Sequence, residues 1–157
     1  MGLIDDCTKE EVMMFRESEL VHGRVAMVAA LGLVTQEVFH PLFPEIDGPA
    51  DRQLDLVLKT SNGQLAGSVL LMAIFFSEFA RARIGWVDPD LETRSLRADY
   101  TPGDLGFDPL GMGPKTEKDM FAMKNKELNN GRLAMLACAG IVAQELATEK
   151  TLFGNFV

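Results

Sequence analysis

The feature of the sequence that most constrains the fold is an internal repeat. Residues 19–37 and 127–145 align without a gap at a constant offset of 108, and 11 of the 19 aligned pairs are identical. The identical pairs include glutamate, arginine and glutamine in the same register, which a chance likeness between two alanine-rich helices does not explain. Two copies at so long a period do not make a solenoid. We therefore expect a protein with internal pseudo-two-fold symmetry.

Both copies of the repeat have the composition of a helix, with Ala, Leu, Met, Glu, Gln and Arg dominant and no proline. Each copy contains only 12 uncharged residues in a row, between its arginine and its second glutamate, and a run of that length is typical of a buried core helix. A third helix is expected between the copies. Its uncharged window, Thr60 to Ser77, has 18 residues, enough for a membrane span.

Two architectures compete: a soluble bundle of three amphipathic helices and a membrane protein with three spans. In a three-span chain, ten Lys and Arg residues fall on the side of the N-terminal arm and three on the other side. This asymmetry fits the positive-inside rule. We therefore predict an all-α membrane protein, one domain over residues 1–157, with transmembrane helices at about 17–38, 64–84 and 122–146.

The charged residues of the repeat predict how the two copies pack. On a helical wheel Glu19 and His22 share a face, whereas Arg24 lies about 140° from Glu19, so Glu19 and Arg24 do not pair within the helix. The second copy has Glu127, Asn130 and Arg132 at the matching positions. We expect the first and third helices to cross around a pseudo-two-fold axis, with Glu19 paired to Arg132 and Arg24 paired to Glu127.

The polar side chains of the three helices are single donors spread along the chain. They are Glu19, His22, Gln36, Glu78, Glu127, Asn130 and Gln144. This spacing excludes a metal held by four to six protein ligands. It suits several metals that each take one axial ligand because a macrocycle fills the equatorial plane. Carboxylate and amide oxygens favour magnesium, which indicates chlorophyll. The alternative role for these polar side chains, above all for the two glutamines, is to form hydrogen bonds between packed helices.

The sequence resembles the light-harvesting chlorophyll-binding family, whose first and third spans carry ExxHxRxAM and ExxNxRxAM. These motifs read here as residues 19–27, ELVHGRVAM, and 127–135, ELNNGRLAM. The resemblance implies axial ligands to chlorophyll magnesium at Glu19, His22, Glu78, Glu127, Asn130 and Gln144, with Gln36 as a further ligand, and structural ion pairs through Arg24, Arg81 and Arg132. Residues 103–111, GDLGFDPLG, resemble the family's loop for a carotenoid end group, which implies a role for Asp104, Phe107 and Asp108.

Two departures make the chain more similar to the chlorophyll a/c antennas of red-lineage algae. Leu70 stands where green-lineage members have a glutamine ligand, and the chain ends 13 residues after Gln144. The implied cofactors are chlorophyll a, chlorophyll c and fucoxanthin or a related xanthophyll such as diadinoxanthin, with magnesium as part of chlorophyll. The implied partners are a photosystem I or II core, neighbouring antenna subunits and thylakoid lipids, in a plastid thylakoid membrane with the N-terminus stromal.

Three functions are weighed. The first is a non-enzymatic antenna that passes excitation to a photosystem. The second is a photoprotective relative, for which the lumenal carboxylates Glu45, Asp47, Asp51 and Asp55 are too few to decide. The third and most remote is a di-iron enzyme, because Glu19-x-x-His22 matches half of a site that takes two such motifs. A net charge of −8 argues against nucleic-acid binding.

Overall fold

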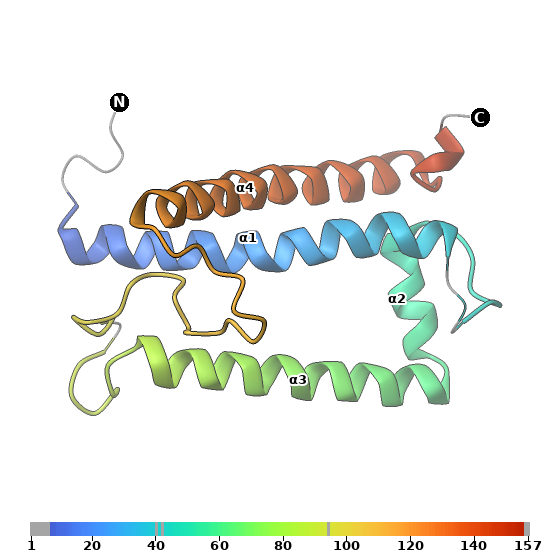
Figure 1. Cartoon of the computed structure of the whole chain (residues 1–157). Helices are drawn as coiled ribbons and strands as arrows, with labels where there is room; N and C mark the ends of the chain where they lie inside the picture. The colour runs from blue at the N-terminus through green and yellow to red at the C-terminus, as the bar shows by residue number, and fades with distance from the viewer. Residues whose placement is uncertain (1–6, 40, 42, 94, 156–157) are drawn as a thin grey trace.

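The computed structural model describes residues 7–39, 41, 43–93 and 95–155, and within them the fold is helical (Figure 1). Its elements in chain order are α1 (Lys9–Val38), α2 (Ala50–Leu58), α3 (Ser61–Gly85), α4 (Glu117–Thr148) and the 3-10 helix η1 (Phe153–Asn155). The described residues contain no β-strand, only an isolated antiparallel bridge between Trp86 and Leu96. The three long helices cover the predicted spans, and α2 and η1 were not predicted.

Each of the three long helices begins after a threonine whose hydroxyl oxygen accepts a hydrogen bond from the first turn. The bonds run from Glu11 N to Thr8 at 3.3 Å, from Gly63 N to Thr60 at 3.0 Å and from Asp119 N to Thr116 at 3.2 Å. Such N-caps satisfy amide groups that have no partner inside the helix. The caps start the helices at residues 9, 61 and 117, so each helix is longer than the apolar span predicted within it.

The helices α1 and α4 run side by side in the same direction and cross at two glycines that are mates in the repeat (Figure 1). A Cβ atom on Gly23 would lie 3.0 Å from Gly131 Cα, and one on Gly131 would lie 2.9 Å from Gly23 Cα. The buried apolar residues of this seam, Leu20 and Ala26 on α1 and Leu128 and Ala134 on α4, are also repeat mates. The repeat therefore provides both halves of one helix–helix contact.

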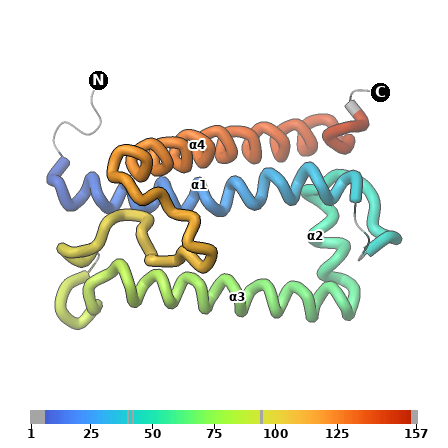
Figure 2. The backbone as a smooth tube through the Cα atoms, viewed as in Figure 1, coloured from blue at the N-terminus to red at the C-terminus, as the bar shows by residue number. Residues whose placement is uncertain are grey.

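The helix α3 stands apart from this pair (Figure 2). It packs on α2 at its beginning and reaches α1 near its end through the ion pair of Arg81 with Glu17. The only described residues of α3 that are buried are glycines near its two ends, Gly63 and Gly85. Its apolar side chains, such as Leu71 and Phe76, remain exposed on all sides. A helix that is apolar all round is stable in surroundings that are themselves apolar.

The short helix α2 connects the α1–α4 pair to α3 at the end of the molecule where α1 ends. Pro49 is its N-cap and provides no side-chain hydrogen bond. The missing cap comes instead from α4, because Glu145 Oε2 accepts the amide N–H of Asp51 at 2.9 Å. This cap depends on a residue 94 positions away, which explains why sequence inspection assigned no helix here.

Among the described residues, two helices are long and apolar enough to cross a membrane, α1 and α3. Helix α4 has 32 residues but does not reach the same hydropathy. Its first turns are charged, with Glu117, Lys118, Asp119, Lys124 and Lys126. Of the three transmembrane helices predicted, two therefore have the hydropathy of a span, and the third, α4, is charged along its first turns.

Candidate functional site

Two ion pairs flank the glycine crossing of α1 and α4. Arg24 Nε donates to Glu127 Oε1 at 2.7 Å, and Arg132 Nε donates to Glu19 Oε1. The second oxygen of Glu19 lies 3.6 Å from a guanidinium nitrogen of Arg16. The second oxygen of Glu127 takes no hydrogen bond from any residue that the structure describes. Each arginine thus fixes one carboxylate oxygen, while the other oxygen faces Arg16 at Glu19 and has no described hydrogen-bond partner at Glu127.

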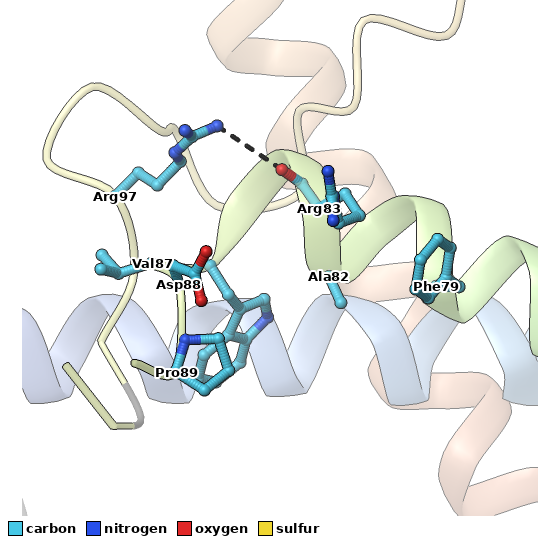
Figure 3. Close-up of a pocket in the computed structure, with 8 residues that line it drawn as sticks. Phe79, Ala82, Arg83, Val87, Asp88, Pro89 and Arg97 are labelled. Carbon is cyan, nitrogen blue, oxygen red and sulfur yellow. Dashed lines mark hydrogen bonds between the residues drawn. The ribbon is translucent and has the colours of Figure 1, made fainter. Parts of the chain in front are cut away.

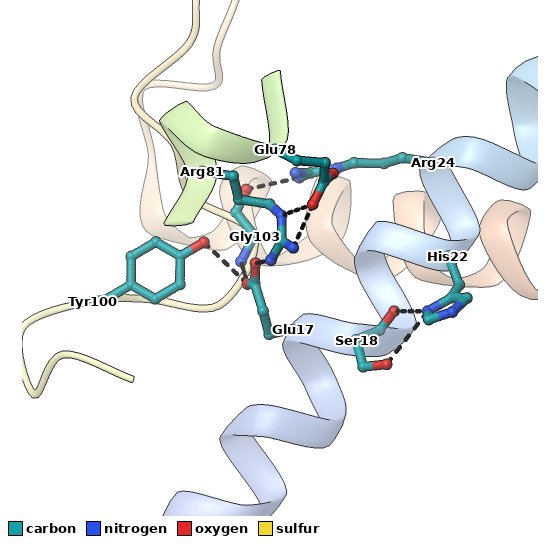
Figure 4. Close-up of polar contacts among 8 residues, drawn as sticks. All are labelled: Glu17, Ser18, His22, Arg24, Glu78, Arg81, Tyr100 and Gly103. Atoms are coloured by element: carbon teal, nitrogen blue, oxygen red, sulfur yellow. Dashed lines mark hydrogen bonds and ion pairs between the residues drawn. The ribbon is translucent and has the colours of Figure 1, made fainter. Parts of the chain in front are cut away.

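His22 lies on the exposed side of α1, and its ring is held by the preceding turn. Its Nδ1 is 2.7 Å from the carbonyl oxygen of Ser18 and 3.3 Å from the Ser18 hydroxyl (Figure 4). A carbonyl oxygen only accepts, so Nδ1 carries the proton and Nε2 bears the free lone pair. This tautomer and a fixed ring are the usual preparation of a metal-ligating histidine.

Asn130 occupies the equivalent position on α4, is exposed and has no side-chain hydrogen bond within the described chain. His22 and Asn130 therefore present one nitrogen and one oxygen donor at pseudo-symmetric positions.

A third arginine-held glutamate lies near the end of α3. Arg81 Nε donates to Glu78 Oε2 at 3.0 Å, and its Nη2 donates to the same oxygen. Its remaining terminal nitrogen donates to Glu17 Oε1 on α1 at 3.2 Å (Figure 4). Glu78 Oε1 therefore has no described hydrogen-bond partner, as at Glu127. The structure brings the predicted residues Glu78 and Arg81 together and adds a partner that was not predicted.

That partner, Glu17, is 2% exposed and joins three parts of the chain. Its Oε2 accepts hydrogen bonds from the Tyr100 hydroxyl at 3.0 Å and from Gly103 N at 2.7 Å, while Arg81 takes Oε1. Arg24 Nη2 donates to the carbonyl oxygen of the same Gly103 at 2.7 Å. Sequence inspection missed Glu17 because the matching residue of the second repeat is Asn125, so the repeat did not mark this position.

The hydroxyl of Tyr100 titrates far above its usual range. Burial of the phenol, followed by its hydrogen bond to Glu17 and the negative charge of that carboxylate, raises the pKa of Tyr100 to about 12. Tyr100 therefore stays protonated and donates its hydrogen bond at any physiological pH.

A cavity of about 670 Å³ opens between α3 and the loop that Glu17 and Arg24 hold. Its lining includes Ser77, Ala80 and Ile84 of α3 together with the predicted loop residues Asp104 and Phe107. The ring of Phe107 is 85% exposed, so it offers an apolar surface to a ligand. Asp108 does not line this cavity. Its carboxylate accepts the N–H groups of Met112 and Gly113 and fixes the turn that follows.

At the opposite end of the α1–α4 pair, both copies of the repeat place a glutamine beside a glutamate. Gln36 donates to the carbonyl oxygen of Ala50 at 3.2 Å, a packing contact with the start of α2, whereas Gln144 forms no side-chain hydrogen bond with a described residue. Glu145 is 1% exposed and caps α2, and Glu37 accepts the amide N–H of Leu152 at 2.9 Å. Both glutamates are identical in the repeat, a signal that sequence inspection did not use.

The described residues contain no group of three His, Cys, Asp or Glu side chains that could hold one metal ion. The sequence contains a second Glu-x-x-His motif, Glu37 to His40, so the expectation that the chain carries only half of a di-iron site was wrong. His40 lies outside the described residues. Glu19 and Glu37 are 18 residues apart on α1, a separation of about 27 Å at the helical rise. The two motifs therefore do not meet at one site.

The model of the family "Chlorophyll A-B binding protein" matches residues 1–146. The chain therefore belongs to the chlorophyll a-b binding protein family. It is 42% identical to the light-harvesting complex stress-related protein 1 of Chlamydomonas reinhardtii, over 99% of this chain and 62% of that protein. It is 43% identical to the fucoxanthin-chlorophyll a-c binding protein of Isochrysis galbana, over 96% of this chain and 72% of that protein. The chain spans about three fifths of the length of the stress-related relatives.

Proposed function

We propose that this protein is a light-harvesting antenna of the plastid thylakoid membrane, with α1, α3 and α4 crossing the bilayer and the N-terminus on the stromal side. The observation that carries the proposal is the repeated arrangement of a glutamate with one oxygen fixed by arginine and the other without a hydrogen-bond partner, at Glu127 and Glu78. A carboxylate neutralised in this way can supply one axial oxygen to a chlorophyll magnesium inside a membrane.

The surroundings of the donors support the same proposal. Val25 follows His22 by three residues and Leu133 follows Asn130 by three, so each shares the donor's helix face. Both side chains are exposed in this chain. An apolar side chain next to one polar donor suits a flat macrocycle with a metal at its centre. We assign axial contacts to Glu19, His22, Glu78, Glu127, Asn130 and Gln144. To Gln36 we assign a helix-packing role instead.

The pigments are proposed from the cavity and from the relatives. The cavity beside Phe107 and Asp104 suits the ring of a xanthophyll, with the polar end near the carboxylate and the chain along α3. The relatives from Isochrysis galbana and Chattonella marina are fucoxanthin-chlorophyll a-c binding proteins. We therefore propose chlorophyll a, chlorophyll c and fucoxanthin or diadinoxanthin as ligands.

In this role the residues of the chain bind and orient pigments and perform no bond-making chemistry. When bound, chlorophyll absorbs light and passes excitation on. The protein fixes the spacing and the local electric field of each pigment. Excitation would pass to a photosystem I or II core through neighbouring antenna subunits, with thylakoid lipids around the outer faces of the helices.

Pigment analysis of the purified protein tests the proposal. We expect several chlorophylls per chain, with chlorophyll c and a xanthophyll, after purification in mild detergent and extraction for chromatography. A folded protein without chlorophyll would overturn the proposal. Chlorophyll b in place of chlorophyll c would overturn the choice of pigments but leave the antenna role intact.

A photoprotective role is the second candidate, and one observation favours it. Glu145 Oε1 and Asp51 Oδ1 are both buried without a hydrogen-bond partner in the described structure, where α4 meets α2. Protonation of either carboxylate would provide a missing donor and so link this contact to pH. The test is the chlorophyll fluorescence lifetime in liposomes at neutral and acidic pH. A lifetime that shortens in acid supports quenching, and an unchanged lifetime supports an antenna.

A further inference from the structure

A separate cavity of about 490 Å³ lies between the last two turns of α3 and the segment that follows the helix (Figure 3). It forms because the chain turns back after the helix, with Val87 N donating to Ser95 O at 3.0 Å and Arg97 N donating to Gly85 O at 2.9 Å. The turn places Arg97 opposite Arg83 of α3, and both arginines line the cavity. None of the proposed pigment ligands lies in its lining.

The two arginines of this cavity differ from the others in the chain. Seven arginine side chains are described, and five of them form ion pairs: Arg16, Arg24, Arg52, Arg81 and Arg132. Neither Arg83 nor Arg97 pairs with a carboxylate that the structure describes. In a chain with a net charge of −8, two neighbouring guanidinium groups that form no ion pair indicate a site for an anion from outside the chain.

The neighbouring groups limit what the anion can be. Asp88 also lines the cavity, which leaves a net charge of +1 there, and its carboxylate accepts the amide N–H of Asp90 at 3.4 Å. The Arg83 guanidinium lies 5.9 Å from the centre of the Phe79 ring, and Arg97 donates to the Arg83 carbonyl oxygen at 3.5 Å. The cations thus lie at one end of an apolar surface rather than in a wholly polar pocket.

The position along the helix indicates the source of the anion. Trp86 is the C-cap of α3, lines the same cavity and is the chain's one tryptophan. Tryptophan and arginine at the end of an apolar helix are typical of the level of the lipid headgroups. Basic residues at this level attract anionic lipids.

We propose that this cavity binds the phosphate or sulfonate headgroup of an anionic membrane lipid. Arg83 and Arg97 hold the headgroup oxygens, and one acyl chain lies along Phe79 and α3. The site rests on the proposed membrane location of α3. It places one bound lipid at the end of the helix that has the fewest protein neighbours, and so tethers Trp86 and Arg97 to the bilayer.

The test counts lipids that stay with the purified pigment–protein. The protein is placed in nanodiscs of phosphatidylcholine alone or mixed with phosphatidylglycerol or a sulfolipid, and is then returned to detergent. Bound lipid is measured by extraction and mass spectrometry. The variant is Arg83→Gln with Arg97→Gln. The matched control is Arg52→Gln, an exposed arginine at the far end of the molecule that pairs only with Glu149. Trp86→Leu provides a second, uncharged perturbation.

We expect the double variant to retain about tenfold less anionic lipid than the wild type, because each basic residue near the surface contributes to this attraction. Trp86→Leu should lower retention less, and Arg52→Gln should not change it. If the double variant retains as much anionic lipid as the wild type, the proposed site is wrong. If inorganic phosphate at the same concentration displaces the lipid, the site binds phosphate and a lipid is not its occupant.

Chlorophyll is measured in the same samples. A wild type that lacks chlorophyll but retains the lipid would refute the proposed function and leave this site standing.

Discussion

The carboxylate of Glu17 on α1 accepts a 2.7 Å hydrogen bond from the backbone N–H of Gly103, 86 residues further along the chain. The carbonyl oxygen of Gly103 accepts a bond from Arg24, so α1 holds both polar groups of this loop residue. Gly103 has φ +81°, a conformation that favours glycine, and a Cβ there would lie 2.6 Å from Leu20 Cδ1. One buried glutamate thus positions the loop that walls the 670 Å³ cavity and also orients Arg81 toward Glu78.

Glu17→Gln is expected to release the pigment at Glu78. Without the Glu17 charge, the Arg81 guanidinium is free to take both oxygens of Glu78, including the one that would bind magnesium. Reconstitution with pigments, followed by chlorophyll and xanthophyll counts per chain, measures this effect. Glu10→Gln is the control, because Glu10 is an exposed carboxylate on the same helix. Equal pigment loss in both variants would show that Glu17 has no specific role.

Gly23→Ala should weaken the crossing of α1 and α4, because the new Cβ would lie 3.0 Å from Gly131 Cα. Overpacking of this kind destabilises by about 1–3 kcal/mol. Gly32→Ala is the matched control, since no atom of a neighbouring segment lies within 4 Å of its Cβ position. It should stabilise the helix slightly. Thermal unfolding followed by circular dichroism at 222 nm compares the two. A lower midpoint for Gly32→Ala would place the contact elsewhere along the helices.

The pair of Arg24 and Glu127 should show coupling in a double-mutant cycle. Arg24→Leu and Glu127→Gln are each expected to lower the temperature of pigment release. The double variant should lose less than the sum, by on the order of 1 kcal/mol, as for polar pairs between membrane helices. The exposed pair of Arg52 and Glu149 serves as the control and should be close to additive. Strict additivity for Arg24 and Glu127 would mean that they do not interact in the assembled protein.

His22→Ala and Asn130→Ala should each remove one chlorophyll per chain and leave the helices folded. Each residue is exposed and supplies a single donor atom, so its loss removes an axial bond without opening a core. His22→Asn should restore part of the binding, because its amide oxygen is also a magnesium ligand. Pigment stoichiometry after reconstitution is the measurement. Full pigment content in His22→Ala would show that this histidine binds no chlorophyll and only contacts Ser18.

Tyr100 is the only tyrosine of the chain, so its ionisation can be followed by absorbance near 295 nm. The pKa of Tyr100 in the folded protein is raised to about 12, above the usual value of 10 in an unfolded chain. Its hydrogen bond to Glu17 therefore stabilises the fold fully below pH 10, and this stabilisation is lost as pH rises from 10 to about 12. Glu17→Gln should move the midpoint downward, because the nearby negative charge is gone. A titration midpoint near 10 in the wild type would contradict this environment.

The repeat made much of the site predictable from the sequence. Because residues 19–37 and 127–145 match in register, the facing partners of Glu19 and Glu127 could be inferred before any coordinates, and the structure places these atoms within hydrogen-bond distance. The three long helices could also be predicted from the sequence, because each contains an uninterrupted run of uncharged residues. The roles of Glu78 and Arg81 were expected from the resemblance to the family, and their spacing of three residues on one helix allows the ion pair that the structure shows.

Sequence alone was sufficient for the three long helices and the family, because these depend on local composition and on motifs within about ten residues. Only the tertiary structure revealed Glu17 as the residue that holds Tyr100, Gly103 and Arg81 together. It alone gave α2 its cap, because that hydrogen bond comes from Glu145 on α4. Burial of a carboxylate is costly unless hydrogen-bond donors surround it, and at Glu17 those donors come from distant parts of the chain. That convergence is a property of the folded chain, and neither Glu17 nor Glu145 shows it in its own sequence neighbourhood.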